Sequence, residues 1–385
     1  MKPIEYPHFD FDSELSRAVI GLERARAELG SGSTPPIVFF QLKELFQLLT
    51  SIMSARIEGN RTSLLDAVLG AARSKGSSGG EENANDGVEE ILNIQKAIDF
   101  IDETVHAGPI THIYIRELHR LVVSGLRREG DLTPGAYRLG EVAIGGAKHQ
   151  PPFPSDVLDS MSALIAFANV EVEPHKQLLQ SAIVHHRFLW IHPFGNGNGR
   201  VSRLLTYAML VKQGFTATSG YRALNPTAVF GADRAAYYDN LERADALDND
   251  GIVAWCTYVL TGLKTDLLRL TSLTDGDFVV TRLLHPAIER LRDSGRLTAS
   301  EAAALRVVAQ KTVVKAGDLA SALPGSPSTR SQAIRKIVDR GLLIPLENSP
   351  RSYRLAFAPN DLTVHIVHQL DALGFLPTIL RNDPL

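Results

Sequence analysis

The stretch WIHPFGNGNGRVSRLL, residues 190–205, joins two apolar helix patterns through a loop with three glycines and two asparagines. Beyond Arg200, apolar residues recur at three- and four-residue steps, which predicts a buried helix beginning near Arg200. The glycines therefore precede or open a helix. Unpaired backbone N–H groups and the helix dipole favour anions there, and glycine lets a phosphate approach the backbone. The stretch predicts an anion-binding site.

Charged and titratable side chains flank this predicted site. Arg200 and Arg203 lie one helical turn apart, so we expect both guanidinium groups to reach the same anion. His192 precedes the loop, where its imidazole can accept a proton from an attacking hydroxyl. These parts suit phosphoryl or nucleotidyl transfer, in which positioning and charge stabilisation supply most of the catalysis. The alternative is a purely structural turn, but such a turn needs neither the histidine nor the arginines.

The same residues resemble the signature of the Fic family, H-x-F-x-[D/E]-G-N-G-R-x-x-R. A Walker loop fits less well, because Lys and then Ser or Thr would follow its last glycine. The resemblance implies an all-helical core that binds ATP and transfers AMP to a hydroxyl side chain of a target protein. The matching residues are His192, Phe194, Gly197, Asn198, Gly199, Arg200 and Arg203.

The resemblance also implies a role for each residue of the stretch. His192 would be the general base, and Phe194 would anchor the loop in the core. Asn196 stands where the family usually has an acidic residue that holds Mg²⁺, and a neutral amide oxygen should bind a hard dication more weakly. ATP as substrate and Mg²⁺ are the expected cofactors. The nucleotide would contact Gly195, Gly197, Asn198, Gly199, Arg200 and Arg203.

A second motif, SARIEGN, occupies residues 54–60. It resembles the inhibitory motif [S/T]-x-x-x-E-[G/N] of Fic proteins whose inhibitory helix precedes the active site. The resemblance implies that Glu58 pairs with Arg203 and blocks placement of the γ-phosphate, so that loss of Glu58 releases activity. The alternative for Glu58 is an ordinary exposed carboxylate at a helix end.

Two further segments extend the resemblance. Residues 137–146 alternate in part and end in two glycines, which predicts a short β-hairpin flap on which an extended target segment would pair. ADRAAYYDNLERA resembles the helix beside the nucleoside and makes Tyr237, Tyr238 and Asn240 candidate base contacts. Core aromatics with polar tips are the alternative for the tyrosines.

His185 and His186 precede His192 by less than two helical turns. Three histidines so close together raise a metal cluster as one interpretation. Their apolar neighbours favour packing in the core instead, since a histidine in a helix is commonly a hydrogen-bonded core residue.

Helical periodicity dominates the chain, so the predicted fold class is all-α with the short flap. We expect an N-terminal helical region at 1–87, a catalytic core at 88–270, and a winged-helix domain with a final helix at 271–385. Residues 74–87 are polar and glycine-rich and predict a mobile surface loop. Helices are expected at 12–29, 37–54, 63–73, 88–105, 112–126, 155–169, 174–190 and 361–381.

Residues 297–357 have the order of a winged helix-turn-helix, with three short helices and a hairpin. The third helix carries Arg330, Arg335, Lys336 and Arg340, and such helices often enter the DNA major groove. Protein contacts or a solvated surface are the alternatives.

Composition bounds these interpretations. The 385 residues are 44% hydrophobic and carry a net charge of only −3, so nothing draws the whole chain to DNA or to an anionic membrane. A single cysteine, Cys256, excludes an internal disulfide and a cysteine zinc site. Without a signal-peptide pattern or a run of about 18–20 uncharged apolar residues, we expect a cytoplasmic location and no membrane partner.

The leading hypothesis is an autoinhibited protein adenylyltransferase, and the resemblance makes a homodimer an expectation. One alternative is AMP removal by the same site, with Glu58 as the base for a water molecule. The other is a DNA-binding regulator whose Fic site only senses nucleotide. The sequence does not name the target protein.

Overall fold

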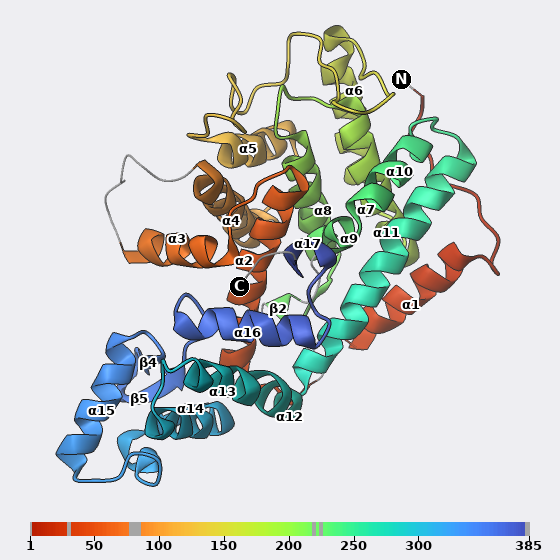
Figure 1. Cartoon of the computed structure of the whole chain (residues 1–385). Helices are drawn as coiled ribbons and strands as arrows, with labels where there is room; N and C mark the ends of the chain where they lie inside the picture. Colours follow the sequence, from red (N-terminus) through yellow and green to blue (C-terminus); the bar gives the residue numbers. More distant parts are fainter. Residues whose placement is uncertain (1, 29–31, 77–85, 218–220, 223–225, 382–385) are drawn as a thin grey trace.

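The computed structural model describes residues 2–28, 32–76, 86–217, 221–222 and 226–381, and these residues are mostly helical (Figure 1). The helices predicted in the first half of the chain are confirmed, within a few residues at each end. They are α1 (Glu14–Glu28), α2 (Pro36–Ile57), α3 (Leu64–Gly76), α4 (Asp86–Thr104), α5 (His112–Val123), η1 (Pro154–Asp156), α6 (Val157–Ala168), α7 (Pro174–Ile191) and α8 (Asn198–Lys212).

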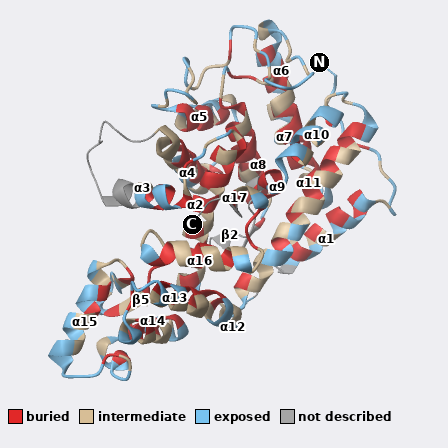
Figure 2. Cartoon of the chain, viewed as in Figure 1, coloured by how far each residue is buried: buried red, intermediate tan, exposed pale blue. Residues whose placement is uncertain are grey.

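The helices that carry the two motifs lie at the centre of the fold. α2 packs on α4, α8 and α9 (Pro226–Ala232), and α8 packs on α7, α5 and α4. Twelve of the fifteen residues of α8 are buried, polar ones such as Arg200 and Arg203 among them, so neighbouring elements enclose this helix on most sides. Figure 2 shows buried residues gathered along α2, α7 and α8. The C-terminal end of α2 and the N-terminal end of α8 are thereby brought together.

α2 is long and apolar enough to cross a membrane by length and composition alone, the only such helix in the described residues. The sequence predicted no such helix, because only runs without charged residues were considered. Lys43 and Glu44 interrupt the apolar run in α2. In the structure, 56% of the apolar window is buried inside the protein. A helix at the centre of a helical core requires the same composition.

The flap prediction is wrong in its secondary structure. Residues 137–146 are all described and contain no strand. Arg138 is 6% exposed and its guanidinium donates to the carbonyls of His192, Gly140 and Pro152 at 2.8, 3.0 and 2.6 Å. The segment is therefore held by a buried side chain in place of a paired strand. Of the loop expected at 74–87, residues 77–85 lie outside the described residues, and the rest belongs to α3 and α4.

The second half of the chain continues with helices over residues 226–293. A two-stranded pair, β1 (Thr216–Ala217) and β2 (Tyr221–Arg222), precedes them. Most of these elements were not predicted individually. They are α9 (Pro226–Ala232), α10 (Arg234–Ala244), α11 (Asn249–Leu270), the 3₁₀ helix η2 (Thr271–Thr274), α12 (Gly276–Phe278), the π-helix η3 (Val279–Leu284) and α13 (His285–Asp293).

The C-terminal elements follow the predicted order with differences. α14 (Ala299–Lys311), α15 (Pro327–Asp339) and the hairpin of β4 (Leu343–Leu346) and β5 (Ser349–Leu355) are present. The second expected helix is only a 3₁₀ turn, η4 (Ala316–Leu319). An additional strand, β3 (Val313–Lys315), pairs antiparallel with β5, which gives the order β3-β5-β4.

The final helix is also shorter than predicted. α16 (Asp361–Ala372) ends before Gly374, whose φ is +80°, and α17 (Thr378–Arg381) begins after Pro377. Glycine in the left-handed region and proline after it are usual at a helix C-terminus. The chain therefore turns back at Gly374, and α17 packs on α2 and α9.

Candidate active site

The glycine-rich loop links α7 to α8 through two left-handed residues. α7 ends at Ile191, and His192 follows with φ 50° and ψ 60°. α8 begins at Asn198, two residues before the predicted start, after Gly197 with φ 76°. Gly197 suits this position because a side chain would be strained there. His192 has a left-handed backbone conformation, which residues other than glycine seldom adopt.

Asn198 and Phe194 close the loop. The Asn198 amide accepts from Phe194 N at 3.0 Å and donates to Phe194 O at 2.9 Å. The Phe194 ring is fully buried and stacks on His119, with centroids 3.7 Å apart. Phe194 therefore lies in the core as expected, whereas the Asn198 side chain braces the loop backbone.

Asn196 is also committed to loop contacts. Its Oδ1 accepts from Gly197 N at 2.7 Å, and its Nδ2 donates to Gly130 O at 3.2 Å. Asp131, which the sequence did not single out, accepts from Asn196 N at 2.9 Å. Among the residues that the structure describes, no group of three or more His, Cys, Asp or Glu could hold a metal ion. A single neutral amide oxygen does not by itself fit Mg²⁺, which prefers carboxylates and phosphates.

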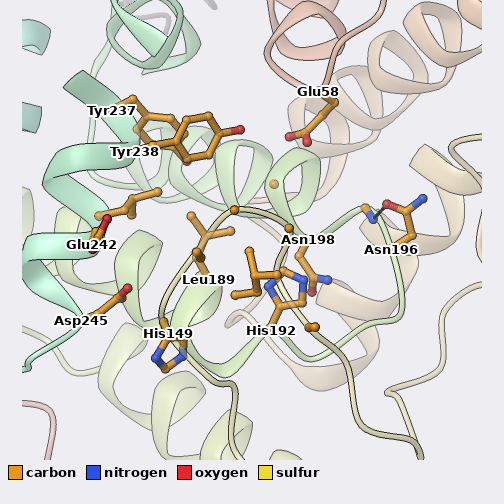
Figure 3. Close-up of a pocket in the computed structure, with 18 of the residues that line it drawn as sticks. Glu58, His149, Leu189, His192, Asn196, Asn198, Tyr237, Tyr238, Glu242 and Asp245 are labelled. Atoms are coloured by element: carbon orange, nitrogen blue, oxygen red, sulfur yellow. Dashed lines mark hydrogen bonds between the residues drawn. The ribbon is translucent and has the colours of Figure 1, made fainter. Parts of the chain in front are cut away.

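A cavity of about 590 Å³ lies in front of the loop (Figure 3). This volume is within the range of small-molecule sites. Its walls come from the end of α2, from residues 143–149, from the loop and start of α8, and from α10. The lining residues are Glu58, Ala143, Ile144, Gly145, Gly146, Ala147, His149, Leu189, His192, Gly195, Asn196, Gly197, Asn198, Gly199, Arg203, Arg234, Tyr237, Tyr238, Leu241, Glu242 and Asp245.

Glu58 lies at the end of α2 and points into this cavity (Figure 3). Its Oε1 is 2.7 Å from Nη2 of Arg203, which also donates to Ser54 from Nε and Nη2 at 3.0 Å each. A Cβ on Gly199 would lie 2.1 Å from the same Oε1. The carboxylate is thus packed against the first turn of α8, where helix N–H groups have no helical partner. The glutamate occupies the predicted anion position.

Electrostatics hold Glu58 in its charged form. Burial raises its pKa, but the nearby Arg203 and Arg200 guanidinium groups outweigh burial, and the net pKa is lowered. Burial lowers the pKa of Arg203, but the charge and hydrogen bond of Glu58, together with Tyr237 and Tyr238, raise it overall. Both groups are therefore ionised at neutral pH.

Arg200 lies elsewhere than expected. It is fully buried, with Nη1 3.1 Å from Glu90 Oε1 on α4 and Nη2 donating to Glu129 O at 2.7 Å. It does not line the cavity. The expectation that both arginines face one anion is therefore wrong for this structure. The Arg200 guanidinium instead pairs with the buried carboxylate of Glu90, and of these two arginines only Arg203 lines the cavity.

His192 lines the cavity and is mostly buried. Burial lowers its pKa to about 4; Arg138 lowers it as well, whereas the Leu189 carbonyl and Glu58 raise it. The imidazole is therefore neutral at pH 7 and can accept a proton. Arg138 donates to the His192 carbonyl at 2.8 Å, which fixes the left-handed turn of this residue.

The predicted base contacts divide into three cases. Tyr238 is 42% exposed, lines the cavity, and has the Arg234 guanidinium 5.5 Å from its ring centroid. Tyr237 lines the cavity but is 1% exposed, and burial raises its pKa. Asn240 does not line the cavity, and its amide donates to Ala236 O at 2.8 Å. Asn240 is thus not placed to contact a bound base.

Besides Arg234, the sequence did not single out Leu241 and Glu242 of α10 or Asp245 just after it, all of which line the cavity. The last three follow Tyr238 at i+3, i+4 and i+7, so helical spacing alone would have placed them on its face. Lys148 bridges to Glu242 at 2.6 Å, although both side chains are solvent-exposed. This pair joins residues 143–149 to α10 at the cavity wall.

His185 and His186 are fully buried. His185 contacts Thr206 Oγ1 at 2.8 Å and Tyr237 Oη at 2.9 Å, and His186 Nε2 is 3.0 Å from Asp245 Oδ1. Burial lowers the pKa of both imidazoles. Both residues pack in the core, and His186 also positions Asp245 at the cavity wall.

Comparisons with known proteins agree with this geometry. Residues 109–210 match the model of the Fic/DOC family. The chain is 31% identical over 162 residues to a protein adenylyltransferase Fic from Nematostella vectensis, covering 40% of this chain and 34% of that protein. A protein of the same name from Drosophila virilis is 29% identical over 237 residues, covering 57% and 45%. The chain thus spans a third to under half of these relatives.

Solved structures share the fold. A Fic family protein from Desulfovibrio desulfuricans superposes with a TM-score of 0.52 at 19% identity, covering 91% of this chain and 98% of that one. A Fic domain containing signaling protein from Bacteroides thetaiotaomicron gives a TM-score of 0.51 at 20% identity, covering 68% and 97%. The glycine-rich loop and His192 lie within residues 109–210, the region that matches the Fic/DOC family.

Proposed function

We propose that this protein transfers AMP from ATP to a hydroxyl side chain of a target protein, and that Glu58 holds the site inhibited. The observation that carries the proposal is the Glu58 carboxylate, 2.7 Å from Arg203 and packed against Gly199. An anionic side chain thus already fills an anion site built from a helix N-terminus and an arginine. The similar proteins named protein adenylyltransferase support the same reaction.

The proposed chemistry follows from the placement of His192. Its neutral imidazole accepts the proton of the target hydroxyl while that oxygen attacks the α-phosphorus of ATP. The new bond joins oxygen to phosphorus, the bond to the β-phosphate bridging oxygen breaks, and pyrophosphate leaves. The amide of Gly199 and the Arg203 guanidinium would balance the phosphate charge, whereas the Gly197 amide already donates to Asn196 Oδ1. Since the side chains alone do not fit Mg²⁺, no step here depends on it.

The other cavity walls would bind the rest of the substrates. Tyr238 and Leu241 of α10 offer an apolar surface to the base. The target segment would lie along residues 137–146. Here Ala143, Gly145 and Gly146 are exposed and line the cavity. Backbone contacts at such a segment would hold a target with little demand on its sequence.

The test is incubation with α-labelled ATP and Mg²⁺, following label into protein, including self-modification. Wild type should label weakly, Glu58→Gly strongly, and the double variant Glu58→Gly with His192→Ala at background. Glu171→Gly, which removes an exposed carboxylate outside the cavity, is the control and should behave as wild type. If Glu58→Gly binds ATP but no label enters protein, the proposal is wrong. If wild type releases AMP from a target that already carries it, and Glu58→Gly does not, AMP removal is favoured.

We also propose a second function, DNA binding by the surface of α15 and the β4–β5 hairpin, which has the element order of a winged helix. The support for DNA binding is the excess of basic over acidic residues in this part of the chain. Arg335 and Lys336 are exposed on α15, whereas Arg330 donates to Leu323 O and Arg340 lies 3.5 Å from Asp361. Residues 311–355 carry Lys311, Lys315, Arg330, Arg335, Lys336, Arg340, Arg351 and Arg354 against Asp318, Asp339 and Glu347.

Titration of a labelled random duplex at several salt concentrations tests this second function. Replacing Arg335 and Lys336 by Ala should weaken binding and lower the salt slope by roughly two. The matched control replaces the exposed Lys176 and Arg282 by Ala. DNA binding by this surface would be refuted if both double variants bind the duplex equally, or if wild type does not bind it at low salt.

A further inference from the structure

The inhibitory helix α2 is tied to the C-terminal elements near both of its ends. Near its start, the Gln41 side chain is 4% exposed and bonds in two directions. Its Nε2 donates to Leu355 O, at the end of β5, at 2.6 Å, and its Oε1 accepts from Phe357 N at 3.0 Å. An amide that uses both its donor and its acceptor on one backbone segment fixes position and rotation together. The first turns of α2 are thereby joined to β5.

The last turn of α2 has a second tie. Arg56, two residues before Glu58, donates from Nη1 to Ile379 O on α17 at 2.9 Å and from Nη2 to Thr62 O at 3.2 Å. The side chains of Ile379 and Ile57 both lie over Gly231 of α9, within 3.1 and 3.8 Å of where its Cβ would be. One guanidinium thus connects α17, the inhibitory helix and the segment after Glu58.

These two sets of hydrogen bonds, from Gln41 and from Arg56, lie near opposite ends of the helix α2. Gln41 and Glu58 are separated by about 25 Å along the helix. Figure 1 shows α2 running from the C-terminal helices, behind α16, up toward α8. A buried helix moves as a unit because packed interiors transmit strain. A shift of β5 or α17 would therefore be felt at the Glu58 carboxylate, whose contact with Arg203 depends on a 2.7 Å approach.

We propose that the C-terminal segment, residues 355–381, clamps α2 in the inhibited position, so that a partner that displaces this segment releases Glu58 and switches on the site. This inference rests on the proposed inhibitory role of Glu58. It assigns a function to α16 and α17, which no part of the proposed chemistry uses. The clamp makes the C-terminal elements a control input for AMP transfer.

The test is a double-mutant cycle between the clamp and Glu58. Ile379→Asp places a charge between α17 and α2, and Arg56→Met removes the donors to Ile379 O. Each variant is made in wild type and in Glu58→Gly, and ATP affinity and AMP incorporation are measured. Ile113→Asp, at a residue 78% exposed on α5, is the matched control. Thermal melts of every variant identify any that fail to fold.

In wild type, both clamp variants should tighten ATP binding by at least about fivefold and raise incorporation. In Glu58→Gly they should change neither quantity, because the contact they release is already gone. Equal gains in both backgrounds, or no gain in wild type while Glu58→Gly is activated, would overturn the clamp.

Hydrogen exchange separates failure of the clamp from failure of the proposed function. The amides of Glu58 and Asn60 bond to the Ala55 carbonyl in the last turn of α2. They should exchange faster in Ile379→Asp than in Ile113→Asp, whether or not AMP is transferred. Unchanged exchange there would refute the clamp, whereas faster exchange together with an inert Glu58→Gly would refute only the enzymatic role.

Discussion

The side chains of His192 and Glu58 face the same cavity, but the imidazole is neutral and the carboxylate is ionised. Burial acts on both, but only the Glu58 side chain pairs with a guanidinium, since Arg138 donates to the backbone carbonyl of His192 and not to its imidazole. The carboxylate therefore stays ionised, while the imidazole stays neutral with a pKa near 4. A neutral base beside an anion site is the state that proton abstraction at neutral pH requires.

The low pKa of His192 predicts the pH dependence of AMP transfer. The base acts when neutral, so activity is present above the pKa and is lost as pH falls through it. In Glu58→Gly, kcat/KM should stay nearly flat from pH 8 to about 6 and fall only below about pH 5. Removing Glu58 takes away an anion that raises the pKa of His192, which moves the fall further toward acid.

The measurement is kcat/KM for AMP incorporation across this range. ATP binding by the variant Glu58→Gly with His192→Ala serves as the control for nucleotide ionisation. A histidine with an ordinary pKa of about 6.5 would lose roughly tenfold in rate between pH 7.5 and 5.5. Such a loss would show that His192 is not the buried, neutral base described here.

At the scale of elements, the tie between α4 and α8 is the least expected feature. Arg200 was expected on a phosphate, yet the structure pairs it with the buried Glu90. Burial raises the pKa of Glu90 in spite of the nearby guanidinium. Glu90 Oε2 also accepts from Asn60 of the SARIEGN stretch at 2.8 Å. The Arg200–Glu90 pair thus joins α8 to α4, and Glu90 adds the segment after Glu58.

Arg200→Ala should therefore act mainly on stability. It leaves Glu90 buried without its cation, which costs about 3–5 kcal/mol in the free energy of unfolding. Arg203→Ala should cost less, because its partner Glu58 retains 26% exposure of its side chain and can reach water. Urea denaturation of both variants measures the difference, with exposed Arg282→Ala as the control. An Arg200→Ala protein as stable as the control would contradict the structural role of this pair.

Some elements were predictable from the sequence and others were not. α7, α8 and the loop between them followed from apolar periodicity and glycines, because their burial is local to the pattern. The flap prediction failed because the buried Arg138 side chain holds the segment through bonds such as that to the His192 carbonyl, 54 residues away, which local alternation does not reveal. β3 escaped prediction because three residues cannot show alternation, and its pairing with β5 is long-range. Asp245 was missed although helical spacing from Tyr238 pointed to it.

At the scale of the whole molecule, the predicted division at residue 271 does not separate two cores. One cluster of buried apolar residues includes Leu45 of α2 and Leu205 of α8 together with Leu291 of α13 and Leu305 of α14. Shared burial makes elements unfold together, since exposing one side of such a core removes the support of the other.

A probe on one side of residue 271 should therefore report damage on the other. Both tryptophans of the chain, Trp190 and Trp255, precede this boundary, and Leu305 follows it, fully buried. Leu305→Ala should cost about 2–5 kcal/mol and move the urea midpoint of tryptophan fluorescence down by roughly 1 M, together with far-UV circular dichroism. Leu132→Ala, at a fully exposed residue, should leave it unchanged. A fluorescence midpoint that stays in place while part of the dichroism signal is lost earlier would mean that the C-terminal elements unfold alone, and a segment that unfolds alone could not hold α2 against Arg203.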